Sequence, residues 1–96
     1  MKLIKDAINH KQILVIVYKG FPRIIEPHIF GAAANGNEYV RGFQTGGTSC
    51  TEEYGWKIMD LKKIQMVSLL PNQFFPKERN DFTRNDPVIK NVYATL

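Results

Sequence analysis

The segment at residues 13–18, with the sequence Ile-Leu-Val-Ile-Val-Tyr, limits the possible folds of this chain most strongly. Almost all of its side chains are β-branched or aromatic, which favours a β-strand. Polar and apolar positions do not alternate in it, so we expect both faces of the strand to be buried. The run is also far too short to span a bilayer. It predicts a central strand in a chain whose 96 residues suffice for one domain, residues 1–96.

Further strands are predicted after this segment, and turn-forming residues separate them. They fall at residues 23–30, 38–44, 56–59 and 64–70. Pro27 lacks a backbone N–H, so we expect its strand to lie at a sheet edge or to bend there. The Asn-Gly-Asn sequence at residues 35–37 is typical of a tight hairpin turn. Gly42 inside a strand predicts a bulge, a bend or the close approach of another backbone.

Helices are predicted at both ends of the chain. A short amphipathic N-terminal helix is indicated by the helical spacing of Leu3, Ile4, Ala7 and Ile8. Near the other end, Asn85-Asp86-Pro87 is typical of a helix start. The apolar residues after it share one helical face, namely Ile89, Val92, Tyr93 and Leu96. The expected fold is therefore mainly β or α+β, with a partly closed five-stranded antiparallel barrel over about residues 12–70 and a C-terminal helix at about 86–96.

Charge and cysteine content narrow the possible environments and partners. The net charge of +4 permits an anionic partner such as a nucleotide or a nucleic-acid backbone. It does not require one, because the chain has no run of five or six basic residues. The single cysteine, Cys50, cannot form an intramolecular disulfide and suggests a reducing compartment. An acid at Asp6 interrupts the position of a signal-peptide apolar stretch, so we expect a cytoplasmic protein that does not act at a membrane.

Arg41 is the first candidate for ligand binding, because Tyr39 and Phe43 flank it on the same predicted strand face. The arginine could hold a phosphate or carboxylate while the rings stack on a base. It could equally be an exposed arginine whose stem lies on the rings. In the Gly/Ser/Thr-rich loop that follows, Gln44 and Ser49 could add hydrogen bonds to a ligand, or the loop could be a flexible hairpin connection.

Catalytic and metal-binding patterns are not visible in the sequence. Trp56 could be a stacking platform, but a core position is more usual for a lone tryptophan. The soft metal ligands His10, His28 and Cys50 are scattered and do not have zinc-site spacing. A nucleophilic pair of Cys50 and His28 has no local support. We therefore expect a protein that is not an enzyme and that has neither a metal nor a cofactor.

Three local patterns resemble the WYL domain, a bacterial ligand-binding module. The first comprises the run at residues 13–18 with Gly20, Arg23 and Glu26-Pro27. The second is the signature strand at residues 38–43, in which Tyr39 and Val40 match and Glu38 stands where the family has tryptophan. The third is the segment at residues 57–64, which follows the family's basic and apolar spacing and contains Lys57 and Lys63. The resemblance covers residues 3–75.

The resemblance implies a small SH3-like (Sm-like) barrel that acts as a sensor. Members are usually appended to winged-helix DNA-binding domains, bind nucleotide-like or nucleic-acid ligands, and sometimes dimerise, so this chain would regulate transcription through a partner. The ligand-binding residues expected from the patterns above are Arg41, Tyr39, Phe43, Gln44, Lys57, Arg23, Ser49 and Lys63.

Two alternatives remain open at this point. The basic residues among the candidates could be solvated charges on different faces that protect sheet edges from pairing. The chain could also be a protein-interaction module that homodimerises or docks on a larger regulator through its edge strands and terminal helix. The aromatic residues of the tail would then form the interface, namely Phe74, Phe75, Phe82 and Tyr93.

Overall fold

The computed structural model describes residues 1–48 and 54–96, and its secondary structure is mainly β. Within these described residues, one helix, α1, precedes the strands, and a single 3-10 turn, η1, lies between two of them. In chain order the elements are α1 (Lys2–His10), β1 (Gln12–Tyr18), β2 (Phe21–Ala32), β3 (Glu38–Gly47), β4 (Gly55–Asp60), η1 (Leu61–Lys63), β5 (Ile64–Phe74) and β6 (Asn91–Thr95). The predicted strands are thus all present, together with one that the sequence did not indicate.

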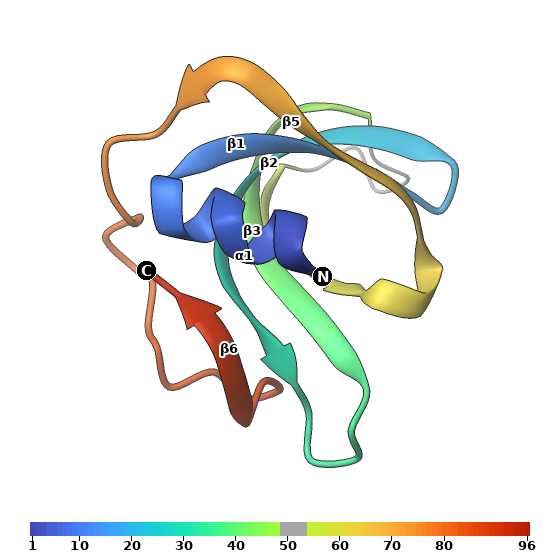
Figure 1. Ribbon diagram of the computed structural model, residues 1–96, viewed down its shortest axis with the longest axis vertical. Coiled ribbons are helices and arrows are strands. Elements are labelled where there is room, and N and C mark those ends of the chain that lie inside the picture. The colour runs from blue at the N-terminus through green and yellow to red at the C-terminus, as the bar shows by residue number, and fades with distance from the viewer. Residues whose placement is uncertain (49–53) are drawn as a thin grey trace.

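The strands form one antiparallel sheet with the order β4-β3-β2-β1-β5, and β6 pairs with a further part of β2. Helix α1 lies across one face of this strongly curved sheet (Figure 1). Among the described residues β4 and β5 are the outer strands of the path, and no ladder joins them. The barrel closure that we expected is therefore not found.

The hydrophobic core lies between α1 and the concave side of the sheet. The predicted N-terminal helix is confirmed, and it buries Ile4, Ala7 and Ile8. Strand β1 lies between β2 and β5, as expected of a central strand. Its burial nevertheless alternates, because Leu14 and Ile16 are fully buried while Val15 and Val17 are only half-buried. The prediction that both faces of β1 are buried was therefore wrong for one face.

Strand β2 changes partner at Pro27. Its first part pairs with β1 as far as Ile25, and its second part pairs with β6 from Ile29 onward. Pro27 has no backbone N–H to donate to a neighbouring strand. It thus lies between the part of β2 that pairs with β1 and the part that pairs with β6, where no such donor is needed. On the other side Pro27 pairs with Gly42, where an added Cβ would meet the side chain of Ile25 and lie 2.9 Å from the carbonyl oxygen of Glu26. The predicted close approach at Gly42 is confirmed.

The predicted C-terminal helix is wrong, because its second half forms strand β6. This strand pairs with β2 from Ile29 to Ala32. The free edge that β2 presents beyond Pro27 offers main-chain hydrogen bonds, and Val92, Tyr93 and Thr95 suit a strand. Of the apolar residues that matched a helical face, Ile89 is buried, whereas Val92 and Tyr93 are exposed. The helical spacing of these apolar residues therefore did not produce a helix. Pairing with the open edge of β2 made residues 91–95 a strand instead.

Strand β5 is longer than predicted and continues through Pro71 to Phe74. It pairs with β1 on one side and is an outer strand of the described sheet. Asn72 has a φ of 60°, and the pairing with β1 is irregular between Leu69 and Phe74. Within residues 1–48 and 54–96, no helix is long and apolar enough to cross a membrane. The same residues contain no group of three or more His, Cys, Asp or Glu side chains that could hold a metal ion.

Candidate functional site

The predicted ligand-binding residues lie on two faces of the sheet rather than in one cluster. Strand β3 places Arg41 and Phe43 opposite Ile58 and Trp56 of β4, on the face that is turned away from the core. Alternation places Gln44 on the other face, opposite the core residue Ile25 of β2. A single ligand therefore cannot contact all of the predicted residues, and we consider the two faces separately.

Arg41 on the outer face forms a bidentate ion pair with Asp86. Its Nε and Nη2 atoms lie 2.5 and 3.3 Å from the two carboxylate oxygens. The side chain of Asp86 is 1% exposed, and its Oδ1 also accepts the backbone N–H groups of Val88 and Ile89. Burial raises the pKa of Asp86, but hydrogen bonds from Arg41 and from the two amides outweigh burial and hold the pKa below its ordinary value. Asp86 is therefore a charged and fully engaged partner of Arg41.

Trp56 is half-buried on the same face and is neither a core residue nor an isolated platform. Its indole makes edge-to-face contacts with His28 and Phe43, at 4.8 and 5.3 Å between ring centroids, and stacks on Phe82 at 6.0 Å. Its Nε1 donates a hydrogen bond of 2.9 Å to Asp81. The sequence expectation of a core tryptophan is thus not met, because Trp56 packs on the outer face and part of its ring lines a pocket.

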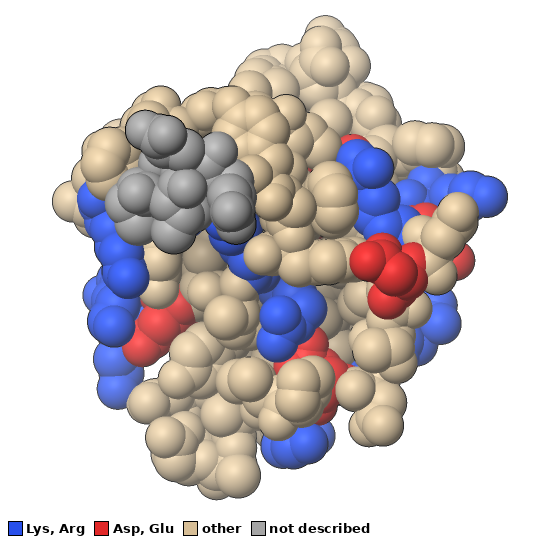
Figure 2. All heavy atoms as spheres, turned by 180° about the vertical axis from the view of Figure 1, so that it is seen from behind, with Lys and Arg blue, Asp and Glu red and all other residues tan. Residues whose placement is uncertain are grey.

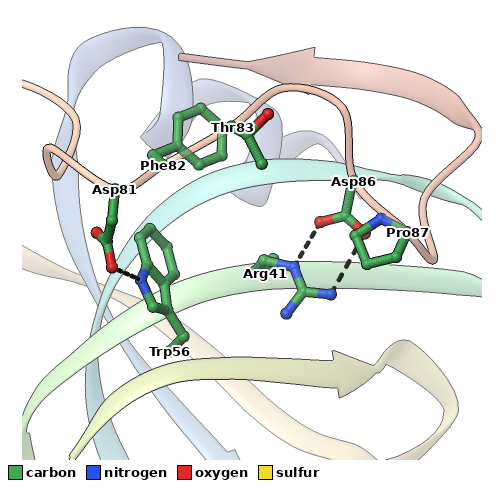
Figure 3. A pocket seen from close by; sticks show the side chains of 7 residues that line it. All are labelled: Arg41, Trp56, Asp81, Phe82, Thr83, Asp86 and Pro87. Carbon is green, nitrogen blue, oxygen red and sulfur yellow. Dashed lines mark hydrogen bonds and ion pairs between the residues drawn. The ribbon is translucent and has the colours of Figure 1, made fainter.

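A pocket of about 230 Å³ opens between Trp56 and Arg41. Figure 3 shows the indole at one side, the Arg41–Asp86 ion pair at the other, and Phe82 and Thr83 on the segment that crosses above them. The complete lining consists of Arg41, Trp56, Asp81, Phe82, Thr83, Asp86 and Pro87. The segment before β6 therefore supplies most of the walls, and β3 and β4 supply the rest.

The ring of Phe43 is covered by a cation from the same segment. The Arg79 guanidinium lies 4.0 Å from the ring centroid and forms a bidentate ion pair with Glu26, at 2.9 and 3.1 Å. Phe43 therefore already has a stacking partner within the chain. Tyr39, four residues earlier in β3, is half-buried.

His28 in β2 holds the start of the segment between β5 and β6 against the sheet. It is fully buried, it stacks on Phe75, and its Nε2 lies 3.1 Å from the backbone nitrogen of Arg79, which donates to it. Its Nδ1 lies 2.8 Å from the carbonyl oxygen of Glu26. These contacts require a neutral ring with the proton on Nδ1. Burial is the main cause that lowers the pKa of His28, which favours the same neutral form.

On the core face, Arg23 and Gln44 each carry a buried polar atom that has no hydrogen-bond partner among the described residues. Arg23 is 4% exposed, its Nη2 lies 3.4 Å from the carbonyl oxygen of Tyr18, and its Nε has no acceptor. Gln44 is fully buried and donates from Nε2 to the carbonyl oxygen of Gly46, but its Oε1 has no donor. Lys57 pairs with Gly42 and so shares this face.

The remaining predicted residues do not join either group. Lys63 is an exposed residue of η1. Ser49 lies outside the described residues, and so does Cys50. In the view from behind, basic side chains form separate groups that have acidic side chains among them rather than one continuous basic surface (Figure 2). The alternative of solvated basic charges fits the exposed Lys63 but not Arg41, which is ion-paired with the buried Asp86, and Arg23 and Lys57 share the core face.

Sequence reasoning missed the contribution of the segment between β5 and β6. Asp81, Phe82, Thr83 and Asp86 all line the pocket, although the sequence indicated only a helix start at Asp86 and a possible interface role for Phe82. One local signal was correct, because Asp86 does accept amides two and three residues ahead. No pattern in the sequence indicated that its carboxylate pairs with Arg41, 45 residues earlier.

Comparison of the chain with known proteins gave no match to a family model, to a curated protein or to a solved structure.

Proposed function

We propose that this chain is a non-enzymatic, WYL-like binding module that holds the anionic group of a nucleotide-like ligand at Arg23. The observation that carries the proposal is the buried guanidinium of Arg23, whose Nε has no acceptor within residues 1–48 and 54–96. No carboxylate of the described residues forms an ion pair with it. The same proposal includes two further points. The fold is an SH3-like barrel, and the chain acts in regulation through a partner.

Arg23 is a buried charge that no carboxylate of the described residues balances. A guanidinium that is removed from water without a counter-charge destabilises the folded state, so a binding role is a reasonable explanation for its position. A phosphate or carboxylate would supply the missing acceptor to Arg23. The unfilled Oε1 of Gln44 would accept a donor from the ligand, and Lys57 on the same face would add positive charge.

Arg41 is not assigned to the anion in this proposal, although the sequence favoured it. Its guanidinium already has a buried carboxylate partner, Asp86, whose second role is to hold the chain before β6. An anion would have to displace that carboxylate and leave it buried without its partner, which is unfavourable. Arg23 has no such competitor among the described residues.

The test is a calorimetric titration with nucleoside monophosphates and with short single-stranded oligonucleotides, at low and at moderate salt. We expect binding that weakens with salt. Arg23→Met should abolish it, whereas Lys63→Gln, which removes the same charge from the exposed η1 turn, should retain it. Binding that survives Arg23→Met would overturn the proposal, as would the absence of any binding at low salt.

A second candidate function, a homodimerisation module, is favoured by strand β5. This outer strand contains no charged residue from Ile64 to Phe74, and it exposes Met66, Leu69 and Phe74. An uncharged outer strand can pair with a strand of another chain. Sedimentation analysis over a range of concentrations tests this function. A concentration-dependent dimer that Met66→Lys disrupts would support it, and a monomer at all concentrations would exclude it.

A further inference from the structure

The pocket beside Trp56 has an electrostatic character that differs from that of the core-face site. Its lining contains one cation, Arg41, and two carboxylates, Asp81 and Asp86. The ion pair between Arg41 and the buried Asp86 cancels one charge of each sign. The carboxylate of Asp81 remains, and Asp81 is exposed to solvent at the pocket edge. The pocket lining therefore carries a net negative charge, although the chain as a whole carries +4.

The walls of the pocket are mainly aromatic or apolar. The indole of Trp56 and the ring of Phe82 lie next to Asp81, and Pro87 lies at the opposite end beside Asp86 (Figure 3). Aromatic faces attract cations through their quadrupoles, and tryptophan does so most strongly. A volume of about 230 Å³ is smaller than that of a typical drug-sized site, so the pocket suits a compact group.

We infer that this pocket binds a small alkylammonium group, with the cation against Trp56 and Phe82 and its charge balanced by Asp81. A quaternary or highly alkylated ammonium suits these walls, because it is large, weakly hydrated and unable to donate hydrogen bonds, so it needs no acceptor beyond the charge of Asp81. An anion does not suit them, because Asp81 would repel it and Arg41 is already neutralised. The proposed site lies on the opposite sheet face from Arg23, so it is independent of the anion site proposed above.

The chain contains one tryptophan, so its fluorescence reports on this pocket alone. We propose to titrate the intact protein with choline chloride and with tetramethylammonium chloride, using sodium chloride at equal concentration as the reference. A saturable change in Trp56 emission in the millimolar range or below is expected. The neutral carbon isostere of choline, dimethylbutanol, should bind more weakly, because it lacks the charge. Equal binding of the isostere, or no change beyond that caused by sodium chloride, would overturn the inference.

Two variants test the residues that the inference names. Asp81→Asn retains an oxygen that can accept the Trp56 N–H but removes the charge, and it should weaken binding by about fivefold. Phe82→Leu removes one aromatic wall at similar volume and should weaken binding by about twofold to fivefold. Asp6→Asn removes an equal charge from α1, outside the pocket, and should leave the affinity unchanged. Unchanged affinity in Asp81→Asn, or an equal loss in Asp6→Asn, would contradict the inference.

The alkylammonium could belong to a free small amine or to an alkylated lysine side chain. A short peptide that carries trimethyl-lysine, titrated beside free tetramethylammonium, distinguishes these sources. Tighter binding of the peptide than of its unmodified form and of the free cation would assign the source to a protein side chain. Binding of the free cation that is at least as tight would assign it to a small metabolite. Failure of both probes would overturn the inference. Arg23→Met should leave either result unchanged, because that residue lies on the other face.

Discussion

The guanidinium of Arg41 in strand β3 donates two hydrogen bonds, of 2.5 and 3.3 Å, to the carboxylate of Asp86, which lies 45 residues later in the chain. The contact joins the middle of the sheet to the segment that leads into β6. Asp86 completes the link because the amides of Val88 and Ile89 bind the same carboxylate. An arginine that was a candidate for ligand binding in the sequence is thus a structural anchor of the C-terminal segment.

Replacement of Arg41 should therefore destabilise the fold. Arg41→Ala leaves the carboxylate of Asp86 buried without its counter-charge, and such changes cost about 3 kcal/mol. Arg41→Lys retains the charge but not the bidentate geometry, so it should cost less than Arg41→Ala. Urea unfolding of the two variants and the parent measures these differences. If Arg41→Ala unfolds at the same urea concentration as the parent, the ion pair does not anchor the segment.

Replacement of Arg23 should have the opposite effect on stability. Arg23→Met removes a buried guanidinium whose Nε lacks an acceptor in the described part of the chain, and it substitutes an apolar side chain of similar length. The free energy of unfolding should stay the same or rise by about 1 kcal/mol. Thermal unfolding without ligand provides the measurement. A marked loss of stability in Arg23→Met would show that the arginine serves the fold rather than a ligand.

Acidification should weaken the fold through His28. Burial lowers the pKa of His28 in the folded state below its ordinary value of 6.5, so the unfolded chain binds a proton more readily. Stability is therefore complete above about pH 6.5 and declines as the pH falls below that value. Melting temperatures measured between about pH 5 and pH 8 should show this decline.

The second histidine of the chain provides the control for this pH dependence. His10→Asn changes an exposed residue at the end of α1 and should retain the decline on acidification. His28→Asn removes the titrating ring and should flatten the curve, although its stability at pH 8 will be lower because the buried ring contacts are lost. An undiminished decline in His28→Asn would assign the pH dependence to another group.

Gly42 should not tolerate a side chain. An added Cβ would overlap the side chain of Ile25 and approach the carbonyl oxygen of Glu26 to 2.9 Å, so Gly42→Ala should cost about 1–3 kcal/mol. Gly46→Ala provides the comparison, because its Cβ would meet only the flexible end of Ile24 at 3.1 Å. Urea unfolding should place Gly42→Ala well below Gly46→Ala in stability. Equal stability of the two variants would exclude close backbone approach as the reason for glycine at position 42.

Several parts of this structure followed from the sequence alone, because they depend on neighbouring residues. The apolar run at residues 13–18 formed a strand between two others, and the spacing of Ile4, Ala7 and Ile8 formed an amphipathic helix. The turn at residues 35–37 formed as expected, with Gly36 at a φ of 89° and the Asn35 side chain accepting the backbone N–H of Asn37. Side-chain alternation and local backbone preferences were sufficient for these features.

The tertiary structure alone decided which residues meet. Residues 91–95 became a strand because β2 has an open edge beyond Pro27, and no local property of the tail encodes the position of that edge. The predicted ligand residues were divided between two faces because alternation along β3 separates Arg41 from Gln44. The pocket beside Trp56 formed because ion pairs and ring contacts hold the segment around Asp86 against β3 and β4. Such contacts join residues far apart in the chain, so they depend on the folded arrangement of the sheet.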